Sequence, residues 1–299
     1  MSLDVSALGN YTDENKMELV RASLLSGKTL GMITVQPGIK SSAAINTLSS
    51  TALWAAGSCG FNAAGSTVLE QRNITVSDIK KNETICLNDL EAKYTQTMMK
   101  AGSYSEEMPF EKLYSEELSG QTAKFIETLA WQGDDSGSGN LALADGFIKI
   151  IDAETGVVTG TSKAMDAANI VDGVDEMVAA IPADVVEAED LILCMGHAEY
   201  RIYTKALRDA NLFHYDGKEG ADFETFVPGT NVKVVAVGGL NGQARMFLGE
   251  ASNFHAGTDL LEDAEAFRIF YSQDNDEVRV IQKMKIGFQV AFPARIVSN

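Results

Sequence analysis

The most sustained pattern along the chain is a helical one between residues 109 and 131. Apolar residues recur there at spacings of three and four. They are Phe110, Leu113, Tyr114, Leu118, Phe125, Ile126 and Leu129. Pro109 suits a first helical turn, and nearby glutamates favour the positive end of the helix dipole. The pattern predicts a helix of roughly 33 Å, long enough to cross a whole domain.

A two-residue alternation dominates the C-terminal part, in VRVIQKMKIGFQVAF. Apolar positions and charged positions take opposite sides, with Ile281 and Gln282 as exceptions. A strand of that length would extend about 50 Å. Asp274, Asn275 and Asp276 predict a turn that pairs this strand with FRIFYS. One long helix and one long ribbon indicate an elongated fold, which suits a shell tile better than a compact enzyme.

Residues 30–76 are rich in Gly, Ala, Ser and Thr and contain only short strand-like pieces, such as MITVQP and TVLEQRNITV. Two large aromatics, Trp54 and Phe61, lie among small residues in TALWAAGSCGFNAAGS. This arrangement is expected of an extended hairpin that needs another surface to cover it. An ordinary long surface loop explains the composition equally well.

The remaining elements are shorter. Helices are predicted at residues 12–25 and 88–100, with a strand-like NITVSDIKKNETICL between them. Residues 161–261 read as an α/β unit. It comprises a helix over residues 163–181, a buried strand DLILCMG, a helix HAEYRIYTKALRDANLF and the strands NVKVVAVGGL and ARMFLGEA.

The run LAWQGDDSGSGNLALADGFIKIID interrupts two apolar stretches with Gly, Asp and Ser. A phosphate loop needs a strand before it and a helix after it. Here a long helix enters the run, and DGFIKIID, which reads as a strand, leaves it. The spacing also lacks the ligands of a calcium loop. Asp134 and Asp135 are therefore interpreted as solvated loop charge, and the run as a connector.

Charge and composition narrow the class of protein. With 24 basic and 42 acidic residues, the net charge of -18 repels phosphate backbones and anionic membranes, so a nucleic-acid reader is disfavoured. No secretion signal or membrane-spanning run is seen. Three widely separated cysteines favour a reducing cytoplasm.

Candidate chemistry is sparse. His197-Ala-Glu199 matches the HxE of zinc deaminases, but the PCxxC partner is missing. His214 and His255 have no second ligand at metal spacing, and Cys59 has no basic neighbour to activate it. We therefore expect no catalytic, cofactor or metal site.

The order of elements resembles the major capsid proteins of tailed bacteriophages, which have the HK97-like fold. The specific passages are WQGD…DGF within residues 109–152 and the alternating strand running into FPARIV within residues 267–297. Over residues 30–76 and 161–261 the resemblance is one of layout.

The resemblance implies an α+β fold with five parts. These are an N-terminal arm (1–29), an extended loop over the neighbouring subunit (30–76), a peripheral domain (77–160) with a spine helix (109–131), an axial domain (161–261) and a returning ribbon (262–299). Trp54, Phe61, Arg72, Gly133 and Asp134 become candidate assembly residues. The connector 133–145 would be a loop beside the spine.

The implied function is a non-enzymatic coat protein that assembles as pentamers and hexamers into the icosahedral head of a tailed double-stranded DNA bacteriophage. Its partners would be itself and scaffolding, portal and decoration proteins, and it would enclose DNA without reading sequence. It would be built in the bacterial cytoplasm and located in the virion. An arm starting almost at Met1 implies a mature form or a separate scaffold, and no cross-linking Lys–Asn pair is assigned.

Three alternatives stay open. A cellular encapsulating compartment could share the fold, an acidic cytoplasmic α/β enzyme could use residues 161–261, and a tail or connector module would form rings or tubes.

Overall fold

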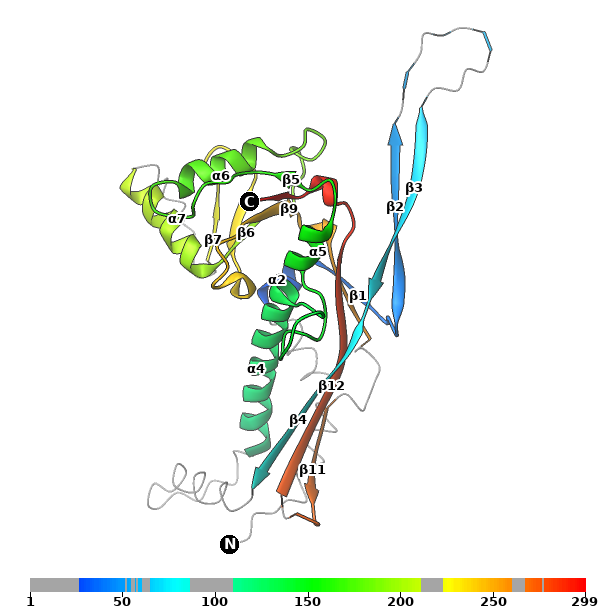
Figure 1. The fold of residues 1–299 in the computed structure, drawn as a ribbon, viewed down its shortest axis with the longest axis vertical. Helices are drawn as coiled ribbons and strands as arrows, with labels where there is room; N and C mark the ends of the chain where they lie inside the picture. Colours follow the sequence, from blue (N-terminus) through cyan, green and yellow to red (C-terminus); the bar gives the residue numbers. More distant parts are fainter. Residues whose placement is uncertain are drawn as a thin grey trace.

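The computed structural model describes residues 27–51, 53–54, 57, 59–60, 65–86, 110–210, 223–259, 267–275 and 277–299. The predicted helices at residues 12–25 and 88–100 lie outside these ranges. Figure 1 shows an elongated molecule in which a long helix and a long ribbon run side by side below a rounded α/β unit, and a hairpin projects at one side. No described helix is both long and apolar enough to cross a membrane.

The predicted long helix is confirmed as α4 (Phe110–Gln132). From residue 117 onward, where the structure describes its side chains, α4 buries Leu118, Ile126, Leu129 and Trp131 completely or almost completely. Leu118, Ile126 and Leu129 share one stripe of α4, which faces the core, whereas Gly120 and Lys124 on the opposite side are exposed. Trp131 lies outside this stripe, in the last turn, where Leu129, Ala130 and Trp131 are all buried.

The predicted long strand is also confirmed, as β12 (Glu277–Val290). It pairs antiparallel with β11 (Phe267–Ser272), β4 (Ser77–Cys86) and β10 (Phe254–Thr258), and β1 (Thr34–Pro37) runs parallel to β10. Together they form a five-stranded sheet. The expected turn pairing places Ser272 opposite Glu277.

The exception at Gln282 has a structural explanation. Its side chain is 5% exposed on the buried face of β12, where its Oε1 accepts a hydrogen bond of 3.0 Å from the Thr122 hydroxyl of α4. The polar side chain keeps the alternation of the strand because a buried partner satisfies it.

The strand predicted for DGFIKIID is wrong. These residues form α5, a short helix over Phe147–Ala153. Phe147 and Ile151, one helical turn apart, are both buried in the main core. A short apolar run fits a buried strand or a buried helix equally well, and here packing against α4 and β12 selects the helix.

A second, six-stranded sheet builds the α/β unit. Its order is β5 (Val158–Thr159), β13 (Val297–Ser298), β9 (Phe247–Glu250), β6 (Leu191–Met195), β8 (Lys233–Ala236) and β7 (Glu224–Phe226). The helices α6 (Ile170–Ala179) and α7 (His197–Asp209) complete the unit. Short 3-10 turns occupy Gly238–Leu240, Ala251–Asn253 and Pro293–Arg295. Strands β6, β8 and β9 and helix α7 confirm the predictions.

The predicted helix over residues 163–181 is too long at both ends. Asp166 Oδ1 accepts hydrogen bonds of 3.0 Å from the backbone N–H groups of Ala168 and Asn169. Such an Asp-centred turn competes with helix, so α6 begins only at Ile170. It ends at Ala179, before Pro182.

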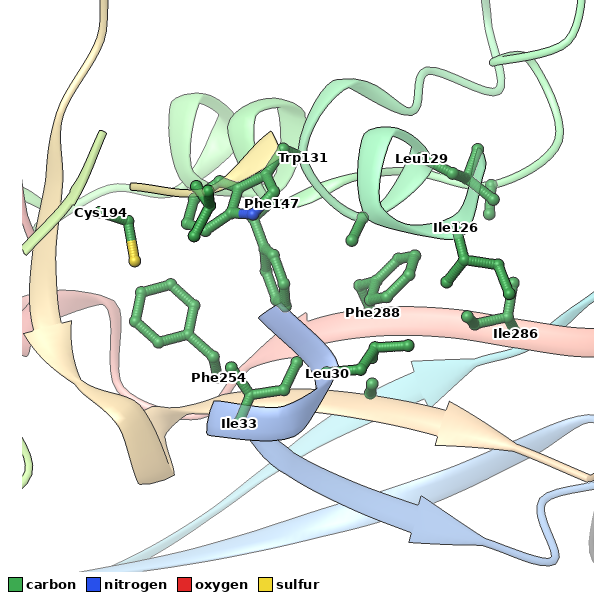
Figure 2. Packing of buried hydrophobic residues seen from close by; sticks show 14 of the residues in the cluster. Leu30, Ile33, Ile126, Leu129, Trp131, Phe147, Cys194, Phe254, Ile286 and Phe288 are labelled. Carbon is green, nitrogen blue, oxygen red and sulfur yellow. The ribbon is translucent and has the colours of Figure 1, made fainter. Parts of the chain in front are cut away.

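The main core joins both parts of the molecule around Trp131 (Figure 2). The indole ring lies 5.4 Å from the rings of Phe147 and Phe247. Its Nε1 donates a 2.8 Å hydrogen bond to Thr29 Oγ1 in α2 (Lys28–Met32). Thr29 in turn donates to the buried Glu127 carboxylate from its hydroxyl (2.6 Å) and its N–H (3.0 Å). This network fixes α2 against the spine helix.

Candidate assembly surface

The hairpin predicted for residues 30–76 exists, over a shorter range. Strands β2 (Ser42–Thr51) and β3 (Ser66–Thr75) pair antiparallel over their full lengths and form a two-stranded sheet of their own. Figure 1 shows them projecting away from the body. The residues before them belong to the body, since Leu30, Ile33 and Ile39 are buried. The ordinary surface loop is thereby excluded.

The outer hairpin, by which we mean the part of the hairpin that ends at Leu69, exposes large apolar side chains where the structure describes them. Trp54 is 96% exposed, Leu69 78% and Leu53 63%, and Leu48 and Val68 are also exposed. No charged residue occurs between Ser41 and Leu69, in a chain of which 22% is charged. Phe61 lies outside the described residues. An isolated hairpin is marginally stable in water, so an uncharged apolar one calls for a covering surface.

The hairpin base is firmly attached. Ile39, Ile45, Ile74, Val76 and Ala291 form a separate small core where β2 and β3 leave the body. Glycine at 287 allows β12 to cross β3 closely, because a Cβ there would overlap the backbone carbonyl of Thr75. The strands therefore project from a packed base instead of a slack linker.

Arg72 contributes to this attachment. Its Nη1 donates to Glu154 Oε1 at 2.7 Å and to the carbonyl of Val290 at 3.1 Å, and its Nη2 contacts Glu154 Oε2 at 2.5 Å. Two parallel N–H···O contacts fix the relative orientation of the groups. Arg72 thus engages its own chain, and its role between subunits stays a prediction.

The connector after α4 is a compact turn. Gly133 is buried, and a side chain there would collide with the carbonyl oxygens of Ala144 and Leu129. The N–H of Asp134 donates a 2.9 Å hydrogen bond to the carbonyl oxygen of Leu141, and the N–H of Gly146 donates one of 2.9 Å to the carbonyl oxygen of Gly133. These bonds turn the chain from α4 directly into α5. A subunit contact of Gly133 or Asp134 stays a prediction.

Asp134 and Asp135 are exposed loop charges, as interpreted, and they also form ion pairs. Lys149 of α5 pairs with Asp134 at 2.8 Å, with Asp145 at 2.6 Å and with Asp135. The hydrogen bond from Lys149 lowers the pKa of Asp134 to about 2 and also lowers the pKa of Asp135. The three carboxylates raise the pKa of Lys149 in return. Their oxygens lie within 4.8 Å of one another, and the lysine ammonium supplies their counter-charge.

The residues considered for catalysis do not converge among the described parts of the chain. His197 Nδ1 lies 3.1 Å from Asn241 Oδ1, and Glu199 Oε2 lies over the backbone of Gly196, where α7 begins. Burial raises the pKa of Cys194 and lowers that of His255. Cys59 is exposed on the outer hairpin, and His214 lies outside the described residues. No nucleophile–base pair is formed by those of these side chains that the structure describes.

No family model and no curated protein matches the sequence. Solved structures do match in fold. A chain of the satellite phage P4 procapsid, a particle that includes size determination (Sid) protein, shares 16% identity, with a TM-score of 0.60 over 95% of this chain and 89% of that one. A capsid chain of an empty GTA particle shares 12% identity, with a TM-score of 0.59 over 93% of this chain and 89% of that one. A chain of a virus-like particle from Pyrococcus furiosus shares 11% identity, with a TM-score of 0.52 over 98% of each chain.

These likenesses extend over nearly the whole chain, including the hairpin, the spine helix and the α/β unit. The chain has the α+β, HK97-like fold of phage capsid proteins, as the resemblance in its sequence implies. At such low identity, the likeness establishes the fold and leaves the function to be argued.

Proposed function

We propose that this chain is the major capsid protein of a tailed double-stranded DNA bacteriophage. It would assemble as pentamers and hexamers into an icosahedral head and would act without catalysis. The observation that carries the proposal is the nearly full-length likeness to capsid chains, together with an uncharged, exposed hairpin that its own body leaves uncovered. Residues buried only by neighbouring copies are what a self-assembling shell requires.

In this proposal, residues 1–29 act as an arm, the hairpin 42–75 within the predicted range 30–76 as the loop over the neighbour, 77–160 as the peripheral domain, 161–261 as the axial domain and 262–299 as the returning ribbon. Trp54 and Phe61 anchor the loop on the neighbouring subunit, and Arg72, Gly133 and Asp134 are further candidate contacts between subunits. Scaffolding, portal and decoration proteins are the expected further partners. The shell would assemble in the bacterial cytoplasm and reside in the virion.

Sedimentation velocity and negative-stain microscopy over a range of protein concentration and salt test this function. Closed particles or five- and six-membered rings are expected. A variant lacking residues 50–66 should remain folded, because the cut lies beyond the packed hairpin base, and should fail to assemble. Normal shells from that deletion would contradict the proposal.

A cellular shell of the same fold is the second candidate. The observation behind it is the match to a virus-like particle whose source, Pyrococcus furiosus, is a cellular organism; the match covers 98% of each chain. Particles purified from the native source distinguish the two functions, since a head contains genomic DNA and a cellular compartment contains protein cargo.

A further inference from the structure

One face of the five-stranded sheet points away from α4. Strand side chains alternate, so the β12 residues that flank buried Val280, Gln282 and Met284 face outward. The pairing register adds outward residues from β4 and β11. We define the basic ribbon face by Lys80, Arg268, Arg279, Lys283 and Lys285, with Phe270 and Ile281 among them.

This face is cationic in an acidic protein. Its strands hold five basic residues and two acidic ones, Asp78 and Glu277, and Asp259 beside β12 also lies 3.6 Å from Lys285. Glu277 pairs with Arg279 at 2.8 Å, and Asp78 lies 3.6 Å from Lys285. With these eight residues set aside, 19 basic and 39 acidic residues remain in the rest of the chain. The net charge of the face is therefore positive, whereas that of the rest of the chain is negative.

Three of the cations are uncompensated. Lys80 and Lys283 lie directly opposite each other in the β4–β12 ladder, and both are exposed. Arg268, also exposed, lies opposite Ile281 in the next outward row. Within the described ranges, none of the three forms an ion pair. Like charges placed directly opposite each other destabilise a sheet, so this arrangement favours an external anionic surface.

The face also has apolar character. Phe270 is 40% exposed and Ile281 is partly exposed between the cations. Aromatic side chains and arginines, here Phe270, Arg268 and Arg279, are enriched at protein interfaces, whereas the backbone of double-stranded DNA offers only phosphate and sugar. Outside this face, a second copy of this chain has an excess of acidic residues, which supplies the complementary charge.

We propose that the basic ribbon face docks onto an acidic surface of a second copy and so sets a subunit contact separate from the hairpin. This inference rests on the proposed assembly function. Its effect is greatest at low ionic strength, because salt screens exposed charges.

Lysine footprinting tests the contact directly. Subunits and assembled particles are acetylated with an amine-reactive reagent, and the reactivity of Lys80 and Lys283 is measured by mass spectrometry. We expect at least a fivefold protection in particles. Carbodiimide treatment of particles made from mixed light and heavy-isotope subunits should join Lys80 or Lys283 to a carboxylate peptide of the other isotope.

Matched variants separate local charge from total charge. K80Q/K283Q and K124Q/K205Q each remove two lysines, the second pair from exposed positions on α4 and α7. The first should raise the subunit concentration needed for assembly about tenfold, as expected for a few weak ion pairs. The second should leave it within about twofold. In 1 M salt, where the screening length is about 3 Å, the difference should vanish.

The outcomes are distinguishable. Absence of particles from the unmodified chain under every condition refutes the proposed function and this inference with it. Particles in which Lys80 and Lys283 keep their subunit reactivity refute the inference alone. Protection that appears only when DNA fills the particle assigns the face to phosphate and also overturns it.

Discussion

Replacement of Trp54 by Ala should separate assembly from folding. The side chain is 96% exposed on the hairpin, so its removal should change the free energy of unfolding by less than about 0.5 kcal/mol. In the assembled shell, we expect this side chain to be buried by a neighbouring subunit. The variant should therefore be a normally folded subunit that assembles poorly.

The magnitude follows from the exposed area. A tryptophan buries about 150–250 Å², which at about 25 cal/mol per Å² corresponds to roughly 4–6 kcal/mol. Ordering of the hairpin and neighbouring side chains offsets part of this value, and interface tryptophans typically contribute about 2 kcal/mol or more. Trp54→Ala should then raise the subunit concentration needed for assembly about thirtyfold. Trp54→Phe should recover most of the difference.

Fluorescence provides the assay, because the chain has two tryptophans in opposite environments. Trp131 is 1% exposed and Trp54 is 96% exposed. In a Trp131→Phe background, emission comes from Trp54 alone and should shift to shorter wavelength as particles form. Equal assembly by the Ala variant, or an unshifted Trp54 emission in complete particles, would refute an anchoring role.

Three further predictions concern the subunit itself. Glu127→Ala leaves the buried N–H and hydroxyl of Thr29 without an acceptor and should destabilise the fold by about 2–3 kcal/mol, measured by denaturant unfolding, with Glu127→Gln less harmful; equal stability of the Ala variant would contradict this role. Because hydrogen bonds from Lys149 and then Ser136 lower the pKa of Asp134 to about 2 from 3.8, they should stabilise the loop above pH 4 and lose that effect as the pH falls toward 2; hydrogen exchange of the loop measures it, and Lys149→Ala should reduce this pH dependence, leaving the part due to Ser136. Gly287→Ala should destabilise the subunit by about 2 kcal/mol in thermal unfolding, since its Cβ overlaps the crossing strand, and an unchanged Tm would show that the crossing can relax.

Long amphipathic patterns were the parts of the fold that the sequence made predictable. The stripe of α4 and the alternation of β12 each continue over many residues, so single exceptions such as Gln282 do not hide them. Short apolar runs carry less information. The seven residues of α5 fit both periods, and the packing around Phe147 decides between them.

The candidate surface was predictable only in part. Large aromatics among small residues indicated an exposed hairpin, and Trp54 lies there as expected. The Arg72–Glu154 contact joins residues 82 positions apart, and no local signal announces it. Lys149 and Asp145 have the i,i+4 spacing of a helical ion pair, so the reading of this segment as a strand concealed that pair.

The distribution of charge makes physical sense of an acidic chain that assembles. A net charge of -18 on every copy opposes close approach, so contacts need either no charge or the opposite charge. The outer hairpin, uncharged from Ser41 to Leu69, meets the first condition, and the basic ribbon face meets the second. Salt has two opposite effects on assembly. It screens the general repulsion between the acidic copies, which favours association, and it screens the attraction at the basic ribbon face, which weakens that contact. Assembly driven by both contacts should therefore be favoured at intermediate ionic strength, whereas assembly driven by the hairpin alone should strengthen steadily as salt rises.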